Sequence, residues 1–144
     1  MTAEQNQQAQ ERLGEILEAR AFDRFPEVWA DDVVDHDPAP DQQPGLAGIV
    51  DFWTEFTTAF PDLTLEPDPL VVTDDYITAV FTIRGTHTGP FQGHAPTGRT
   101  FEVRGIQVSK FRDGKIAERW GATDEKGLAE QLALGSGDVH FVSA

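Results

Sequence analysis

The 144-residue chain contains no cysteine, and its basic residues are few, with 11 Lys+Arg against 25 Asp+Glu. Without cysteine the chain cannot form a disulfide, a thiolate metal site or a cysteine nucleophile. The formal net charge of -14 repels polyanions at long range, which disfavours binding to nucleic acid or to an anionic membrane surface. Any chemistry must therefore come from histidine, carboxylate, hydroxyl or amide groups.

Long hydrophobic runs are also missing. The sequence has no stretch of about 18 apolar residues, and its polar first ten residues lack the basic patch and apolar core of a secretion signal. We therefore expect a cytoplasmic protein. With 39% hydrophobic and 25% charged residues, the composition is typical of one globular domain. We expect this domain over residues 1–134 and a C-terminal tail over 135–144, whose Val139, Phe141 and Val142 would dock on the body or on a partner subunit.

The spacing of apolar residues changes along the chain. A spacing of three to four predicts a helix over residues 3–21, a short helix over 22–29 and a third helix over 45–60. After Pro61 the spacing falls to about two, which predicts strands, and a short helix follows Asp124. The expected strands cover residues 63–72, 76–87, 99–112 and 115–123, and a short extended segment covers 33–38. Asp113-Gly114 predicts a hairpin that makes the last two strands antiparallel neighbours.

Helices grouped before strands indicate an α+β fold, with the helices packed on one face of a curved antiparallel sheet. Such a sheet can leave a pocket between the two layers. This predicted pocket is where we expect any ligand to bind.

Several ordered motifs carry a family resemblance. The longest is the glycine-rich string from Gly85 to Arg99, GTHTGPFQGHAPTGR. The others are Phe60-Pro61-Asp62-Leu63, Asp113-Gly114-Lys115-Ile116-Ala117-Glu118, Trp120 four residues before Asp124, and Gln131-Leu132. Over roughly residues 10–134 the chain thus resembles the SnoaL-like polyketide cyclase family. The resemblance implies the cone-shaped α+β fold of the nuclear transport factor 2-like superfamily, with N-terminal helices on the concave face of the sheet, and a homodimer.

The resemblance also implies an activity. Characterised cyclases of this family close a polyketide ring by an intramolecular aldol condensation of a methyl ester, without metal or cofactor, using an aspartate as acid and base. That aspartate corresponds to Asp124, eleven residues after Asp113. The family's Gln and His on the preceding strand fall on Gly105 and Gln107, so the chain departs from the pattern at both. A cofactor-independent hydroxylase, an isomerase, an epoxide hydrolase or a non-catalytic binding or assembly module stays an alternative.

Four polar residues are candidates for the catalytic site, and each has a structural alternative. Asp124 is either the N-cap of the last helix or an acid/base group in an apolar pocket. His36 is either a surface histidine or a donor to a substrate carbonyl oxygen. His87 shares its parity with an apolar row and either anchors the glycine-rich loop or faces the substrate. Gln107 would end another apolar row and would need a partner or a ligand there.

Aromatic residues are the candidates for substrate contact. Trp53, Phe56, Phe60 and Trp120 would line the pocket, although packing in the core explains each equally well. The four histidines form no i, i+4 helical pair and no His-Glu-x-x-His motif, so we expect no metal and no cofactor. The expected partners are a small apolar carbonyl compound and a second copy of the chain.

Overall fold

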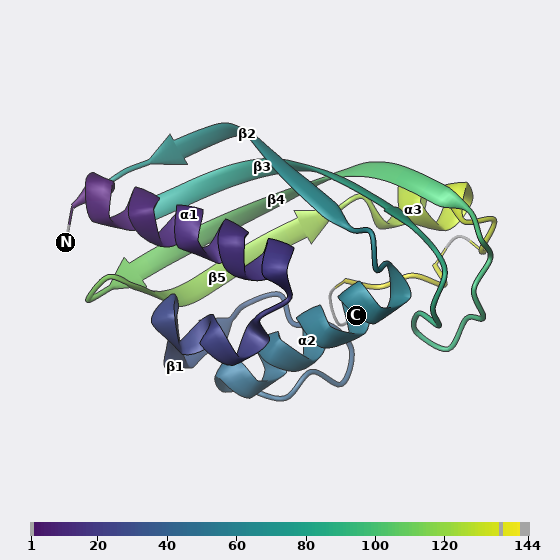
Figure 1. The fold of residues 1–144 in the computed structure, drawn as a ribbon, viewed down its shortest axis with the longest axis horizontal. Helices are drawn as coiled ribbons and strands as arrows, with labels where there is room; N and C mark the ends of the chain where they lie inside the picture. Colours follow the sequence, from purple (N-terminus) through teal and green to yellow (C-terminus); the bar gives the residue numbers. More distant parts are fainter. Residues whose placement is uncertain (1, 136, 142–144) are drawn as a thin grey trace.

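The computed structural model describes residues 2–135 and 137–141. Its elements, in chain order, are α1 (Ala3–Ala19), the 3-10 helix η1 (Phe22–Glu27), β1 (Trp29–Asp35), α2 (Gly45–Ala59), β2 (Thr64–Val72), β3 (Tyr76–Thr86), β4 (Thr100–Arg112), β5 (Lys115–Thr123) and α3 (Glu125–Gln131) (Figure 1). The predicted α+β class is confirmed. No helix in the described part of the chain is long and apolar enough to cross a membrane.

The five strands form one sheet in the order β1-β5-β4-β3-β2. Strands β2 to β5 are antiparallel to their neighbours, whereas β1 is parallel to β5. Asp113 and Gly114 both have positive φ, 54° and 77°, as a tight two-residue hairpin turn requires. The predicted hairpin between β4 and β5 is therefore confirmed.

The boundary between η1 and β1 differs from the sequence-based expectation. Trp29 was expected at the end of a helix, but it starts β1 and pairs with Ile116 of β5. Its side chain is 1% exposed. Pro26 lies inside η1, and the helix ends at Glu27. Because proline lacks the N–H that helical hydrogen bonding needs, the aromatic spacing from Phe22 to Trp29 does not extend one helix through this region.

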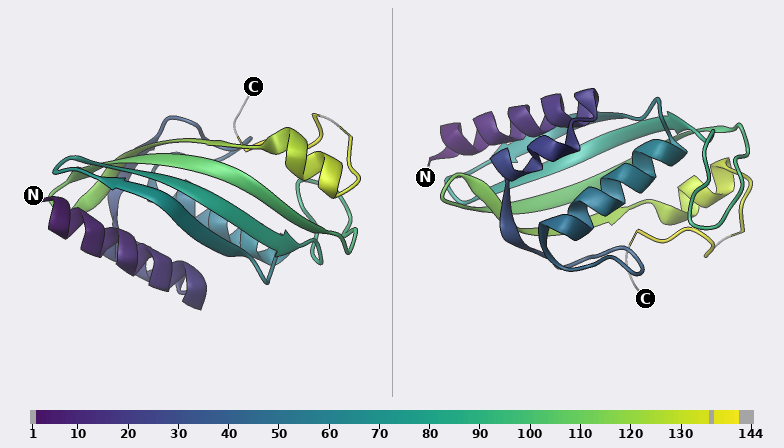
Figure 2. Two further views of the ribbon diagram at one scale, coloured as in Figure 1. Left: turned by 90° about the horizontal axis from the view of Figure 1, so that it is seen from above. Right: turned by 60° about the horizontal axis from the view of Figure 1, so that its bottom comes forward.

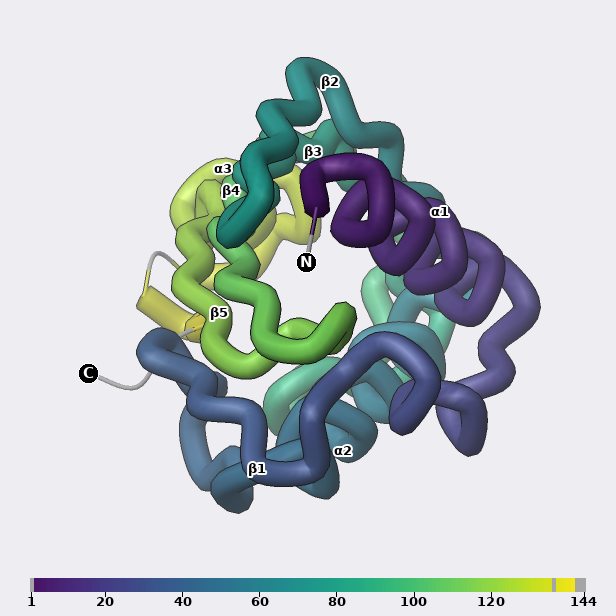
Figure 3. Tube along the Cα trace, turned by 90° about the vertical axis from the view of Figure 1, so that its left-hand side faces the viewer, coloured from purple at the N-terminus to yellow at the C-terminus, as the bar shows by residue number. Residues whose placement is uncertain are grey.

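Helices α1 and α2 cover the concave face of the sheet (Figure 2). Viewed along the long axis, the strands β2 to β5 curve around one side while α1 and α2 close the other (Figure 3). Helix α1 buries Ala9, Leu13 and Ile16 toward the sheet, as its i, i+4, i+7 spacing predicts. The opposite face of the sheet carries no helix in the described part of the chain.

The glycine-rich loop between β3 and β4 is anchored to the end of α2. The backbone N–H groups of Thr88 and Gly89 both donate to the carbonyl of Ala59. A Cβ atom at Gly89 would lie 2.3 Å from the carbonyl oxygen of Thr58, so this approach requires glycine. The loop is thereby placed beside α2.

Candidate functional site

A cavity of about 480 Å³ lies between the helices and the concave face of the sheet. Its volume falls in the range of about 300–1,000 Å³ found for small-molecule sites. Much of its wall is apolar, including Leu13 and Leu17 of α1, Trp53 and Phe56 of α2, and Phe81 and Ile83 of β3. The cavity therefore offers an apolar ligand a partly enclosed site with apolar walls.

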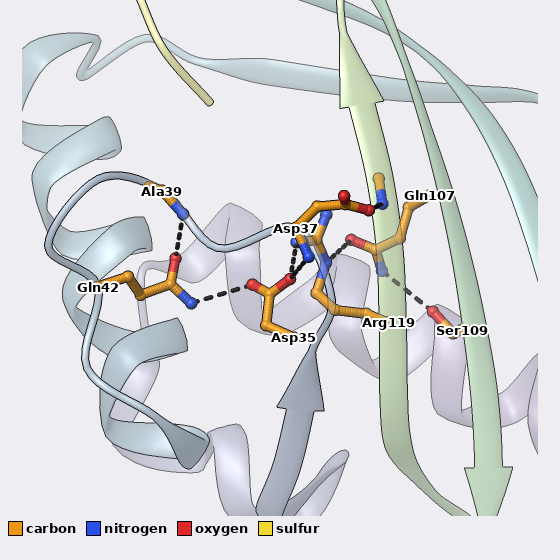
Figure 4. A network of polar contacts seen from close by, with 8 residues as sticks. Asp35, Asp37, Ala39, Gln42, Gln107, Ser109 and Arg119 are labelled. Carbon is orange, nitrogen blue, oxygen red and sulfur yellow. Dashed lines mark hydrogen bonds and ion pairs between the residues drawn. The ribbon is translucent and has the colours of Figure 1, made fainter. Parts of the chain in front are cut away.

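Besides polar residues elsewhere in its wall, such as Glu18 of α1 and Arg20 at the C-cap of that helix, the cavity has a group of polar side chains at one end (Figure 4). They come from the end of β1 and the segment after it, and from β4 and β5. The residues are Asp35, Asp37, Gln42, Gln107 and Arg119, which form one hydrogen-bonded network. We call this network the polar end of the cavity.

An ion pair forms the centre of the polar end. Arg119 Nη1 donates to Asp35 Oδ1 at 2.7 Å, with side chains only 19% and 9% exposed. Asp35 also accepts hydrogen bonds from the backbone N–H of Asp37 and from Gln42 Nε2, each at 3.0 Å. Three donors satisfy the Asp35 carboxylate, so its role is to hold Arg119 in place.

Gln107 fixes the guanidinium of Arg119 from the other side. Its Oε1 accepts from Arg119 Nε at 3.2 Å, and its Nε2 donates to Ser109 Oγ at 3.1 Å. Among the described residues, Arg119 Nη2 has no hydrogen-bond partner. Arg119 Nη2 lies where a side chain at position 121 would be. A Cβ atom on Gly121 would lie 2.1 Å from Nη2, so glycine at this position leaves room for the guanidinium. The polar end thus holds the guanidinium of Arg119 in a fixed position, with its Nη2 group free to donate a hydrogen bond.

Asp37 supplies an acceptor in the same network. Its Oδ2 accepts from the backbone N–H of Gly121 at 2.8 Å. Its Oδ1 has no hydrogen-bond partner within the described ranges. The side chain lines the cavity and is half-buried. The polar end therefore combines a free carboxylate oxygen with the free donor of Arg119.

The structure places Asp124 at the N-cap of α3. Its Oδ1 accepts from the backbone N–H of Gly127 at 2.8 Å, the residue is exposed, and it does not line the cavity. The enclosed, apolar surroundings that the predicted acid/base role needs are not found around this side chain. Its geometry matches the structural alternative, a helix cap.

His36 and Trp120 lie together on the outer face of the sheet. Asp35 and Arg119 pair across β1 and β5 and face the cavity, so the next residue on each strand points the opposite way. The two rings stack with centroids 4.5 Å apart, and His36 Nε2 donates to Glu118 Oε1 at 2.9 Å. That hydrogen bond lowers the pKa of Glu118. Neither ring lines the cavity.

His87 and Phe60 are buried beside the cavity rather than in its wall. The backbone N–H of Thr97 donates to His87 Nδ1 at 3.3 Å, and Thr97 Oγ1 lies 3.0 Å from the same nitrogen. Because Nδ1 accepts the hydrogen bond from Thr97 N–H, the neutral ring carries its hydrogen on Nε2. Nε2 is buried without a partner among the described residues. Burial lowers the pKa of His87. Its contacts match the predicted anchoring of the glycine-rich loop.

Of the eight residues predicted from sequence, Gln107, Trp53 and Phe56 line the cavity. Sequence reasoning missed Asp35, Asp37 and Arg119. The signal that could have found them is the alternation of a strand: if His36 and Trp120 face outward, the residues beside them face inward.

Comparison with known proteins shows which family the chain resembles. The SnoaL-like polyketide cyclase family matches residues 7–132. The aklanonic acid methyl ester cyclase AcmA of Streptomyces galilaeus is 38% identical over 58 residues, which is 40% of this chain and 40% of that cyclase. The chain therefore matches well under half the length of this curated relative.

Solved structures share the fold over nearly their whole length. IdmH of Streptomyces antibioticus, a candidate polyketide cyclase, is 30% identical with a TM-score of 0.77, over 90% of this chain and 99% of its own. TsrD of Streptomyces laurentii is 26% identical with a TM-score of 0.81, over 89% of this chain and 94% of its own. These structures carry the same helix-covered, curved sheet.

Proposed function

Because this chain belongs to the SnoaL-like polyketide cyclase family, we propose that it closes a ring in a polyketide-like carbonyl compound by an intramolecular aldol reaction, without a cofactor. The observation that carries the proposal is the polar end of the cavity. There a free carboxylate oxygen of Asp37 and a free donor of Arg119 belong to one network in an otherwise largely apolar cavity.

An aldol closure needs an acceptor and a donor of this kind. In our proposal Asp37 Oδ1 removes a proton from the carbon beside a carbonyl, and the carbanion attacks a second carbonyl of the same molecule. Arg119 Nη2 donates a hydrogen bond to the oxygen that gains negative charge. Asp37 then returns the proton to the new alkoxide, so the addition is an isomerisation with no net oxidation. Acid/base catalysis by one positioned group is worth about 10²- to 10⁴-fold.

The apolar walls would contribute by confining the substrate. Trp53 and Phe56 present aromatic surface to a planar ligand, and a fixed conformation brings the two reacting carbons together. Gln107 acts in this proposal as a positioning residue, because its Oε1 accepts from Arg119 and its Nε2 donates to Ser109.

The proposal is tested with aklanonic acid methyl ester, the compound for which the relative AcmA is named. We expect a product of unchanged mass with a new retention time and absorption spectrum, formed without uptake of dioxygen. Gain of one oxygen atom from dioxygen would contradict the aldol closure and indicate a hydroxylase. Incorporation of oxygen from water would indicate a hydrolase.

We also propose that two copies of the chain associate through the outer face of the sheet. This face exposes the large apolar side chains Val34, Val71, Tyr76 and Ile106, which are 39–54% accessible. In the described part of the chain, α1 and α2 lie on the other face of the sheet (Figure 2). The exposed apolar side chains lie on four of the five strands, β1, β2, β3 and β4, and a second copy of the chain would remove them from water.

A further inference from the structure

The C-terminal segment of residues 137–141 folds back against the body of the protein. From α3 it runs past the glycine-rich loop toward α2 (Figure 2, right). Val139 is 1% exposed and Phe141 9% exposed, and both belong to the core cluster that includes Phe56. The predicted docking of Val139 and Phe141 on the body is thus found, whereas Val142 lies outside the described residues. The segment also lies beyond residues 7–132, which match the family.

The backbone of this segment is held by side chains of two other elements. Gln92 of the glycine-rich loop makes a reciprocal pair with His140: its Nε2 donates to the carbonyl of His140, and its Oε1 accepts from the backbone N–H of His140 at 2.8 Å. Glu125 Oε1 of α3 accepts from the backbone N–H of Phe141 at 2.8 Å. These bonds fix the position of Phe141 as a strand partner would.

Phe141 forms part of the cavity wall. It lines the cavity, and its ring lies 5.5 Å from that of Phe56 and 6.2 Å from that of Phe52. A second cavity of about 450 Å³ adjoins the first, because Gln42, Phe52 and Phe56 line both, whereas Phe141 lines only the first. The second cavity also touches the tail. The C-terminal segment therefore lies beside both cavities.

We propose that Phe141 determines how long a substrate the cavity accepts, with Gln92 and Glu125 as the residues that position it. The ring of Phe141 ends the apolar space on the side of Phe52 and Phe56. Removing it would enlarge the first cavity beside Phe52 and Phe56 and admit a larger apolar ligand. This inference rests on the proposed function at one point: it takes the ligand that binds in the cavity to be the substrate.

The test uses rigid aryl methyl ketones of two sizes, 2-acetylnaphthalene and 2-acetylanthracene, with binding measured by calorimetry. We expect the parent to bind the smaller ketone more tightly. In Phe141→Ala the affinity for the larger ketone rises by about tenfold relative to the smaller, because the vacated space accepts the extra ring. Phe22→Ala is the matched control: Phe22 is half-buried but lines neither cavity, so the parent's preference should persist.

Two further variants keep the proposal testable if Phe141→Ala does not fold. Gln92→Ala removes the reciprocal pair and should shift the preference in the same direction by a smaller factor. Phe141→Trp enlarges the wall and should weaken binding of the larger ketone. An unchanged preference in the folded variants, or no binding of either ketone by the parent and the variants, would overturn the proposal. The test measures binding and not turnover. The size preference can therefore be found even if the protein does not catalyse the aldol reaction.

Discussion

At the scale of single residues, the unusual group is His87, a histidine that is 0% exposed. Burial lowers its pKa below the ordinary 6.5, and the nearby His94 adds to this in the same direction. The folded protein therefore holds His87 neutral at a pH where the unfolded chain already binds a proton. Between those two pKa values the unfolded state binds more protons, so stability must fall as the pH falls.

We predict that the free energy of unfolding decreases as the pH is lowered below about 6.5, in the window where an unperturbed histidine gains its proton. In His87→Phe, which cannot ionise, this part of the pH dependence should disappear. Urea unfolding at several pH values measures it, and His36→Gln on the outer face serves as the control. Equal slopes for the parent and His87→Phe would show that His87 does not cause the effect.

Gly121 is a second residue whose role can be tested alone. A methyl group there would lie 2.1 Å from Arg119 Nη2 and displace it, whereas the backbone contact, 3.3 Å from the carbonyl oxygen of Ile106, is tight but needs a shift of only a few tenths of an ångström. We predict that Gly121→Ala folds with a nearly unchanged melting temperature but loses about tenfold or more in kcat, since removing one such donor typically costs about 10²- to 10³-fold.

The control for Gly121→Ala is Gly14→Ala, which adds a methyl to the cavity wall on α1 where no atom lies within 4 Å. It should retain the parent's kcat. If both variants kept full activity, the Nη2 atom of Arg119 would have no part in the reaction.

At the scale of elements, α1 depends on one polar side chain for its place. Asn6 is 0% exposed, and its Nδ2 donates to the carbonyls of Thr73 and Asp74 in the β2–β3 hairpin, each at 2.9 Å. Since α1 forms one wall of the cavity, this side chain also fixes the shape of the site.

We predict that Asn6→Ala lowers the free energy of unfolding by about 1–3 kcal/mol, because two partly buried hydrogen bonds are lost. Gln8→Ala, on the exposed side of the same helix, should change it by less than about 0.5 kcal/mol. Chemical denaturation measures both values. Equal effects in the two variants would contradict the assigned role of Asn6.

The elements also show what a sequence can predict. The spacing of apolar residues predicted α1, α2 and the antiparallel strands, because each of these elements buries one face. Asp113-Gly114 predicted the hairpin, because these two residues readily adopt the positive φ that its turn requires. The parallel pairing of β1 with β5 was not predicted, because it joins segments more than 80 residues apart. Asp35 and Arg119 meet only through that pairing, so no local pattern could show the ion pair at the polar end of the cavity.

At the scale of the whole molecule, the sheet has one covered and one open face. The open face exposes Ile106, 48% accessible, beside Val80 of the neighbouring strand. We predict a mass of about twice 15.9 kDa by light scattering for the parent. Ile106→Glu should yield monomers, because a charge placed in a buried apolar contact is costly. Gln8→Glu on α1 should remain dimeric, and a monomeric parent would contradict the proposed association.

The whole account rests on the polar end of the cavity as the place of reaction. Asp37 and Asp124 allow a matched comparison, because asparagine keeps an acceptor oxygen at either position. At position 37 this oxygen can still accept from the backbone N–H of Gly121, and at position 124 it can still accept from that of Gly127 and cap α3. The measurement is kcat for Asp37→Asn and Asp124→Asn with aklanonic acid methyl ester. We predict a loss of about 10²-fold or more for Asp37→Asn and turnover near that of the parent for Asp124→Asn. The reverse result would return the acid/base role to Asp124 and contradict the site proposed from the structure.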